Sequence, residues 1–156
     1  PCVSCAGQGA LRQQRKLQVR VPPGVDTGAR VALSGQGAKG HGGGKRGNLI
    51  ITFKVEPHRF FKRQGLDVHV AVPINIVQAT LGTKIKVQTV SGQKVILKIP
   101  EGTQSGTKFR IRDQGVEKDG VLGDQYVEVL VQVPEELTEE EQRAMEEFAT
   151  ARGMRD

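Results

Sequence analysis

The sequence predicts a mainly β protein made of two tandem β-sandwich-like modules, with a short helix between two of the strands and a helix at the C-terminal end. Three observations predict this fold class. Twenty glycines and seven prolines among 156 residues imply many turns, which suit short strands better than long helices. A set of strand-like segments occurs twice along the chain. Only the last segment, 134–153, has a clear helical pattern.

The repeat becomes visible when VPPGVDTGARVALSGQG (21–37) is aligned without gaps with IPEGTQSGTKFRIRDQG (99–115). The matching positions include Pro22/Pro100, Gly24/Gly102, Gly28/Gly106, Val31/Phe109, Leu33/Ile111 and Gly37/Gly115. The similarity extends upstream, where KLQVRV (16–21) matches KVILKI (94–99), and downstream, where GNLIITFKV (47–55) matches GDQYVEVLV (123–131). The chain is therefore predicted to contain two copies of one β module.

The first module is predicted to contain three strands. In the first, 16–21, Leu17, Val19 and Val21 alternate with polar residues and so fall on one face. A Pro-x-Gly break ends this strand. The other two strands are expected over 30–33 and 48–56, with a glycine-rich loop between them.

The second module follows a crossing segment, which Pro57 and HRFFKRQG (58–65) mark. Its strands are expected over 66–74, 83–90, 94–99, 107–112 and 124–133. Between the first two of them, NIVQATLG (75–82) has the pattern of a short helical turn. Gly82 is expected to close this turn, because glycine readily ends helices.

The C-terminal segment has the signals of a capped helix. Thr138 is expected as its N-cap and Glu141 as the third helical residue, which together form a capping box. Met145, Phe148 and Ala149 give a narrow apolar stripe along this helix. The stripe either packs on the second module or meets a partner helix, and the sequence leaves both options open.

The net charge of +6 is unevenly distributed. Residues 1–65 carry twelve Lys/Arg against two Asp/Glu, whereas residues 66–156 carry eleven against fifteen. The basic half is compatible with binding of RNA or of an acidic protein, which stands as the alternative function. No aromatic residues alternate with the basic ones as in RNA-binding sheets, so a solvated basic face is favoured and a nucleic-acid partner is not. No apolar run approaches the length of a membrane span, and no membrane partner is expected.

Cys2 and Cys5 form a C-x-x-C motif in CVSCAGQG (2–9). Two thiolates at this spacing suit one tetrahedral metal, and the motif fits a reducing compartment. A closed structural zinc site needs four ligands, and the sequence has no other cysteine. The two cysteines therefore represent half of a metal site.

Nothing in the sequence nominates a catalytic centre. GQGAKG (35–40) has the glycine spacing of a dinucleotide-binding loop, but more glycines and then a strand follow it instead of a helix. The histidines His41, His58 and His69 are far apart, and no serine lies in a G-x-S-x-G motif. We therefore expect a binding protein and not an enzyme.

An ordered series of motifs resembles one known family. CVSCAGQG is followed by the Pro-x-Gly module, then by HRFFKRQG, VPINIVQATLG (72–82), IPEGTQSG (99–106), GDQYVEVLV and a capped terminal helix. The series covers essentially the whole chain. It resembles the C-terminal substrate-binding region of a zinc-containing DnaJ co-chaperone, a heat-shock protein of the J-domain family, with the last of its zinc-finger repeats.

The resemblance implies a domain organisation. Residues 1–10 correspond to the remnant of the cysteine-rich zinc-finger domain, 11–64 to the first β module without its N-terminal strands, 65–134 to the second β module and 135–156 to a dimerisation helix. The other zinc-finger repeats and the J domain would precede residue 1. The intact protein would then bind zinc, whereas this chain alone is expected to bind none.

The resemblance also implies a function and its residues. The chain would bind unfolded polypeptides as a cytoplasmic chaperone in protein folding and the stress response, and would deliver them to a DnaK-type ATPase chaperone. In the family, the phenylalanine of the F-K-R-x-G segment lines the client pocket, and here this residue is Phe61. The sheet residues expected to share the pocket are Val31, Leu33, Ile51 and Phe53. Met145 and Phe148 are the candidates for a homodimer contact.

Overall fold

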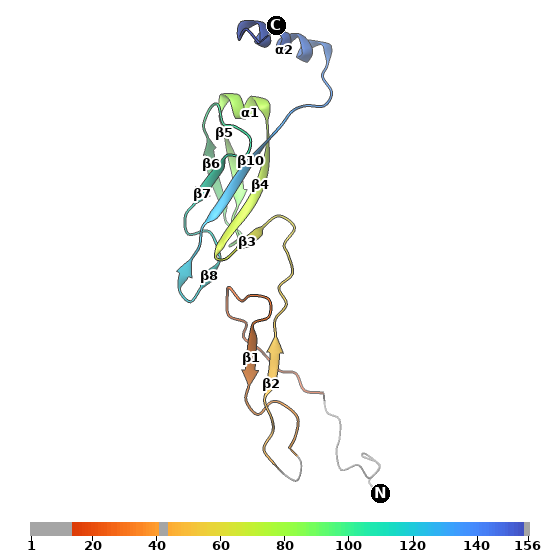
Figure 1. The fold of residues 1–156 in the computed structure, drawn as a ribbon, viewed down its shortest axis with the longest axis vertical. Coiled ribbons are helices and arrows are strands. Elements are labelled where there is room, and N and C mark those ends of the chain that lie inside the picture. Colours follow the sequence, from red (N-terminus) through yellow and green to blue (C-terminus); the bar gives the residue numbers. More distant parts are fainter. Residues whose placement is uncertain (1–13, 41–43, 155–156) are drawn as a thin grey trace.

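The computed structural model describes residues 14–40 and 44–154. Within these ranges the chain forms short strands and two helices, which follow one another along an elongated molecule (Figure 1). A two-stranded sheet lies at one end, a β-sandwich lies in the middle, and a helix lies at the other end (Figure 1). The predicted mainly β class, with a short inter-strand helix and a C-terminal helix, is confirmed.

The two-stranded sheet consists of β1 (Arg30–Leu33) and β2 (Leu49–Thr52), which pair antiparallel. Both strands alternate between half-buried and exposed residues, as a sheet with one covered face requires. The pairing continues past one end of the strands, where the Phe53 N–H donates to the Ala29 carbonyl oxygen at 2.9 Å. The glycine-rich loop that was expected between the strands occupies residues 34–48, of which 41–43 lie outside the described ranges.

The larger sheet of the sandwich has four strands in the order β3-β4-β10-β7. These strands are β3 (Lys62–Gln64), β4 (Asp67–Asn75), β7 (Lys108–Ile111) and β10 (Gln125–Gln132). The two central strands, β4 and β10, run parallel, and the outer strands pair antiparallel with them. On β10, every second side chain from Gln125 to Val129 is buried, which identifies the inner face of the sheet.

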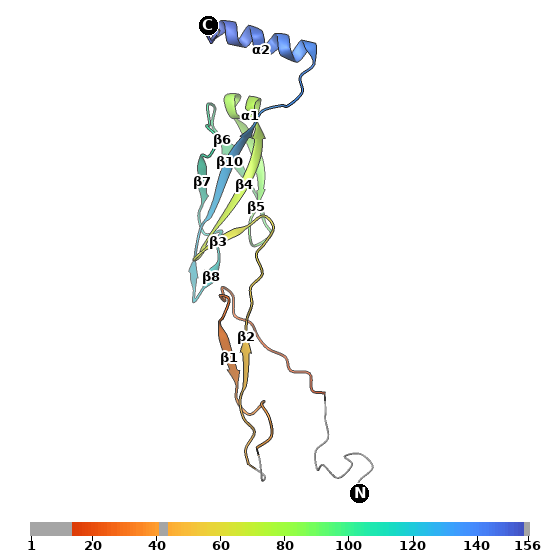
Figure 2. The same ribbon diagram turned by 45° about the vertical axis from the view of Figure 1, so that its right-hand side comes forward.

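The second layer of the sandwich is the hairpin of β5 (Thr83–Gln88) and β6 (Lys94–Ile99). The core between the layers is formed by Ile74, Ala79, Ile99 and Val129. Ile85, Leu97, Phe109 and Val131 pack around it. The β5–β6 hairpin thus covers the inner face of the four-stranded sheet (Figure 2).

Helix α1 (Ile76–Leu81) covers one end of this core and connects β4 to β5. Asn75 and Gln78 form a reciprocal capping box at its start, and Ala79 is buried beneath it. Gly82 ends the helix with a φ of +80°. A Cβ atom at this position would lie 3.0 Å from the carbonyl oxygen of Ile99, so glycine is required both by conformation and by space.

Two further elements complete the described chain. A small ribbon of β8 (Glu117–Lys118) and β9 (Val121–Leu122) turns at Asp119-Gly120, where both residues have positive φ.

Helix α2 (Glu139–Ala151) begins at the predicted capping box of Thr138 and Glu141. Hydrogen bonds from Thr138 lower the pKa of the Glu141 carboxyl group. Neither described helix is long and apolar enough to cross a membrane.

The structure differs from the sequence-based expectation in four places. Strand β2 covers only Leu49–Thr52 of the predicted 48–56, because the segment opposite its end turns at residues 26–29 and the regular pairing stops there. Residues 16–21, predicted as a strand from their alternating pattern, form no strand, because no neighbouring strand pairs with them among the described residues. In the first module the described residues form one two-stranded sheet, whereas the second module has sandwich packing. Strands β3, β8 and β9 were not predicted, since two or three residues are too few to show a period.

Gln125 provides a test of how the two layers are held together. Its side chain is completely buried, donates to the Gln88 carbonyl oxygen at 3.1 Å and accepts from the Val90 N–H at 3.3 Å. Gln125→Leu keeps the volume but leaves both backbone groups without this partner. We expect a loss of about 2–3 kcal/mol in the free energy of unfolding, measured in urea. The control Gln132→Leu, exposed on the same strand, should change it by less than about 0.5 kcal/mol; equal effects of the two substitutions would contradict the assignment.

Candidate functional site

The β1–β2 sheet presents an apolar face that the rest of the described chain does not fully cover. Val31 lies opposite Ile51 and Leu33 opposite Leu49, so these four side chains share one face, and Phe53 continues it by the period of the strand. All five residues are half-buried. We call this set the hairpin face. Among the described residues, β1 and β2 each have only one neighbouring strand, so each also presents an edge of unpaired backbone groups.

Phe61 lies in the crossing segment between the two modules. It is half-buried, and it lines two cavities. The larger has a volume of about 700 Å³ and lies between the crossing segment, the loop at Asp26 and Thr27 of the first module, and Val68, Val90 and Val116 of the second. The smaller, of about 440 Å³, lies between the crossing segment, β4 and β5.

His58 fixes the backbone around Phe61. Its Nδ1 atom accepts hydrogen bonds from the backbone N–H groups of Phe60 at 3.1 Å and of Phe61 at 3.3 Å. Its ring lies 5.1 Å from the ring of Phe61, in a tilted contact. Phe60 is 62% exposed, and the Arg59 guanidinium lies 5.3 Å from its ring centre. The two neighbouring phenylalanines therefore differ, because Phe61 lines both cavities whereas Phe60 lines only the smaller one.

The structure does not bring all the predicted pocket residues together. Val31, Leu33, Ile51 and Phe53 share the hairpin face, whereas the two cavities that Phe61 lines contain none of them. Sequence reasoning could place the four sheet residues on one face from their alternation. It could not place Phe61, which lies in a segment without a period.

An ion-pair cluster that the sequence analysis missed holds the two modules together beside the larger cavity. Asp26, from the first module, contacts Arg63 of β3 at 2.8 Å and Lys118 of β8 at 2.9 Å. Arg63 also donates to the carbonyl oxygens of Val25 at 2.9 Å and Gly24 at 3.0 Å. We call Asp26, Arg63 and Lys118 the junction cluster. The members are far apart in the sequence, so no local pattern could have revealed them.

Gly24 permits the close approach that the junction cluster needs. Its φ is +74°, and a Cβ atom there would lie 2.5 Å from the Glu117 carbonyl oxygen. Any other residue would push the first-module loop away from β8. The contact between the modules thus depends on a glycine that the sequence analysis had identified only as a repeated turn position.

The C-terminal helix directs its apolar stripe toward α1. Met145 and Phe148 line a small cavity of about 190 Å³ together with Ile76, Val77, Thr80 and Leu81 of α1. The contact is partial, because Met145 remains 39% exposed and Phe148 47% exposed. Of the two options that the sequence left open, the contact within the chain is therefore present, and part of the stripe remains accessible.

The predicted metal ligands Cys2 and Cys5 lie outside the described residues. Within 14–40 and 44–154, no group of three or more His, Cys, Asp or Glu side chains could hold a metal ion. The two thiols of the sequence supply half of the ligands that a closed zinc site needs. A zinc ion at this motif would therefore need two further ligands from elsewhere.

The fold and these surfaces together define a class of protein. It is a protein of β modules whose candidate sites are open, apolar sheet surfaces. The DnaJ C terminal domain model matches residues 7–134. The chain belongs to the DnaJ C-terminal domain family.

Curated relatives agree with this assignment over nearly the whole chain. The chain is 48% identical to the Chaperone protein DnaJ of Opitutus terrae over 155 residues, which are 98% of the chain and 40% of that protein. It is 46% identical to the Chaperone protein DnaJ of Halalkalibacterium halodurans over 156 residues, 99% of the chain and 42% of that protein. The chain thus spans about two fifths of the length of these relatives.

The junction cluster predicts a pH-dependent stability. A hydrogen bond from Lys118 and the charge of Arg63 lower the pKa of Asp26 below its ordinary value of 3.8. Because the pKa is lowered in the folded state, the stabilisation is present above pH 3.8 and is lost as the pH falls through the lowered pKa. We expect Asp26→Asn to be less stable than the unmodified chain near neutral pH, and the difference to vanish in acid.

Urea unfolding at several pH values would measure this difference. Glu117→Gln serves as the control, because Glu117 lies beside Lys118 but takes part in none of the ion pairs of the described residues. A difference between Asp26→Asn and the unmodified chain that stays constant down to the most acidic pH would contradict a role for the Asp26 charge.

Proposed function

We propose that this chain binds unfolded or non-native polypeptides and that, within a longer DnaJ-type co-chaperone, it delivers them to a DnaK-type ATPase chaperone. The observation that carries the proposal is the hairpin face, a half-exposed apolar surface beside unpaired strand edges. Membership of the DnaJ C-terminal domain family supports it and disfavours the alternative of RNA or acidic-protein binding by the basic half. The proposed role is binding, without catalysis.

An extended polypeptide would use the hairpin in two ways. Its backbone would pair with an open edge of β1 or β2, which is insensitive to the client's sequence. Its apolar side chains would then lie over Val31, Leu33, Ile51 and Phe53. Each buried side chain contributes about 1.5–3 kcal/mol. Because few side chains are buried, binding would be weak, reversible and tolerant of many sequences, as delivery to another chaperone requires.

Phe61 would extend the site toward the second module. Its ring lines both cavities at the crossing segment, and these are partly apolar spaces that could receive a client side chain. His58 restrains the backbone at Phe61, so the ring is held in position before a client arrives. A client that passes from the hairpin face toward Phe61 would contact both modules.

The remaining parts of the chain would serve the longer protein. We propose that residues 1–10 are the last repeat of a zinc-finger domain, in which Cys2 and Cys5 supply two of the four zinc ligands. Residues 11–64 and 65–134 would be the two client-binding β modules, and 135–156 would carry the dimer contact. The cytoplasm, where thiols stay reduced, is the compartment that fits this chemistry.

The proposed client site can be tested by binding of the chain to a fluorescent, permanently unfolded polypeptide. Ile51→Ala removes part of the hairpin face, and Phe61→Ala removes an aromatic ring that lines both cavities. Because each substitution removes part of one buried side chain, we expect the dissociation constant to rise about 5- to 30-fold for each. Suppression of aggregation of an unfolded model protein should decline in parallel.

Each substitution has a control at an exposed apolar residue outside the proposed site. Ile50 is the neighbour of Ile51 on β2 but points to the opposite face and is 61% exposed, so Ile50→Ala should leave binding unchanged. Leu130→Ala, on the outer face of β10, is the control for Phe61→Ala. Equal losses at Ile50 and Ile51 would remove the hairpin face from the client site, and unchanged binding of Phe61→Ala would remove Phe61.

We further propose that Met145 and Phe148 contribute to a homodimer. Both remain partly exposed beside α1, so an apolar strip is left for a second copy. Phe148→Ser should raise the dissociation constant of the dimer about tenfold or more in sedimentation equilibrium. Leu137→Ser is the control, because Leu137 is 44% exposed but precedes the helix. A chain that is monomeric at all concentrations, or a dimer unaffected by Phe148→Ser, would contradict this assignment.

A further inference from the structure

The outer face of the β5–β6 hairpin carries an unusual concentration of lysines. The inner positions of both strands face the sandwich core, so every second residue points to solvent. The solvent-facing residues are Lys84, Lys86 and Gln88 on β5 and Lys94, Ile96 and Lys98 on β6, and all six are exposed. We call the four lysines, together with Ile96, the lysine face.

The register of the hairpin places like charges opposite each other. Lys84 is the direct cross-strand neighbour of Lys98, and Lys86 is the neighbour of Ile96. Directly opposite side chains on one face lie about 4.5–5.5 Å apart at Cβ, and like charges at this distance destabilise a sheet. None of the three ion pairs found among the described residues includes a lysine of this face. The arrangement therefore costs stability that no ion pair among the described residues offsets.

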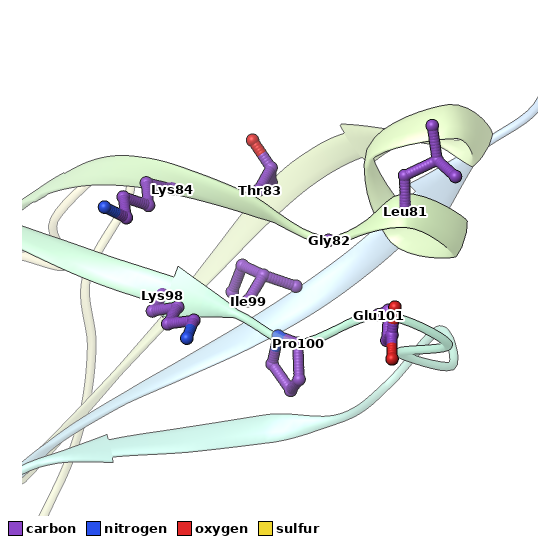
Figure 3. Close-up of a pocket in the computed structure, with 8 residues that line it drawn as sticks. All are labelled: Leu81, Gly82, Thr83, Lys84, Lys98, Ile99, Pro100 and Glu101. Carbon is purple, nitrogen blue, oxygen red and sulfur yellow. The ribbon is translucent and has the colours of Figure 1, made fainter.

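Apolar groups surround the charges. Ile96, at the centre of the face, is 65% exposed. At the end of the hairpin near α1, Lys84 and Lys98 line a cavity of about 440 Å³ with Leu81 and Pro100, and Leu81 is 72% exposed (Figure 3). Glu101 is the one acidic residue in the lining of this cavity (Figure 3). The surface thus combines several unpaired positive charges with exposed aliphatic side chains.

We infer that the lysine face binds an acidic protein segment that carries aliphatic side chains between its carboxylates. Carboxylates would lie between opposite lysines and relieve their repulsion, while the aliphatic groups would cover Ile96, Leu81 and Pro100. The face contains no arginine and no aromatic residue, which are the side chains that nucleic-acid surfaces use for base and phosphate contacts. A nucleic acid would also leave the exposed aliphatic groups uncovered.

The geometry favours an extended segment. Lys84 and Lys86 are two residues apart on β5, so their side chains stand about 7 Å apart along the strand. This spacing equals that of alternate residues in another extended chain. β5 and β6 each have one neighbouring strand among the described residues, so the partner could also pair with an edge. This site meets the proposed client surface at Lys86, which also lines the smaller cavity at Phe61. The substitutions tested below leave Lys86 unchanged, so failure of this inference would leave the client proposal intact.

The experiment uses the full 156-residue chain and a fluorescent ten-residue peptide of alternating glutamate and leucine. We expect saturable binding at low salt that Lys84→Gln/Lys98→Gln weakens about 3- to 20-fold, since each exposed ion pair is worth up to about 1 kcal/mol. Ile96→Ala should weaken binding of this peptide but not of an all-glutamate peptide. A peptide with glutamine in place of glutamate should bind much more weakly.

Two controls make the result specific. Lys62→Gln/Lys108→Gln removes the same charge from exposed lysines of β3 and β7 in the four-stranded sheet and should leave binding unchanged. Urea unfolding should show that Lys84→Gln/Lys98→Gln is at least as stable as the unmodified chain, because opposing like charges have been removed. A loss of stability would instead assign these lysines a structural role and overturn the inference.

Three further outcomes would also overturn the inference. The first is the absence of saturable binding at low salt. The second is an equal loss of binding in the Lys62→Gln/Lys108→Gln variant, which would mean that only net charge matters. The third is that a single-stranded oligonucleotide binds more tightly than the glutamate–leucine peptide, and that the Lys84→Gln/Lys98→Gln change weakens binding of the oligonucleotide. This result would make nucleic acid the partner.

Discussion

The parallel pairing of β4 with β10 is the interaction on which the rest of the structure depends. The register from Gln125↔Val68 to Gln132↔Asn75 brings the inner side chains of both strands to one face, where Val127 and Val129 are completely buried. β7 pairs with the other side of β10, and α1 begins where β4 ends. A shift of one residue would turn these valines to solvent and the opposite side chains into the core. The register of one strand pair therefore decides which side chains of the second module are buried and which remain exposed for binding.

The two surfaces discussed above arise because the two-stranded sheets differ in what covers them. The β5–β6 hairpin places Ile85, Leu97 and Ile99 in the sandwich core, so its exposed face is left with mainly charged side chains. The β1–β2 sheet has no second sheet over it within the described residues, so its apolar side stays half-exposed. The same alternating pattern thus leaves a charged surface exposed where a second sheet covers the apolar face, and leaves the apolar face itself exposed where no second sheet covers it.

The sequence was sufficient to predict features that local chemistry determines. Alternation predicted the strands at 30–33 and 94–99, and both are present. Capping signals predicted the end of α1 at Gly82 and the start of α2 at Thr138, and both are present. The sequence was insufficient where a feature depends on which distant segments pair or contact each other. An alternating pattern at 16–21 shows that a strand would be amphipathic, but not that a neighbour exists. The junction cluster and the opposed Lys84 and Lys98 result from tertiary contacts and register, and the lysine face even lies in the half of the chain with an excess of acidic residues.

The two surfaces also depend on different forces, which limits what each can recognise. Burial of an apolar side chain on the hairpin face gains free energy in proportion to its area and is not screened by salt. Charges on the lysine face are exposed, and at physiological ionic strength they are screened over about 8 Å, a length close to the spacing of neighbouring lysines. Each lysine then acts mainly on a carboxylate in direct contact. Binding on the hairpin face would therefore follow the apolar area of a segment, whereas the lysine face would discriminate by where the carboxylates of a segment lie.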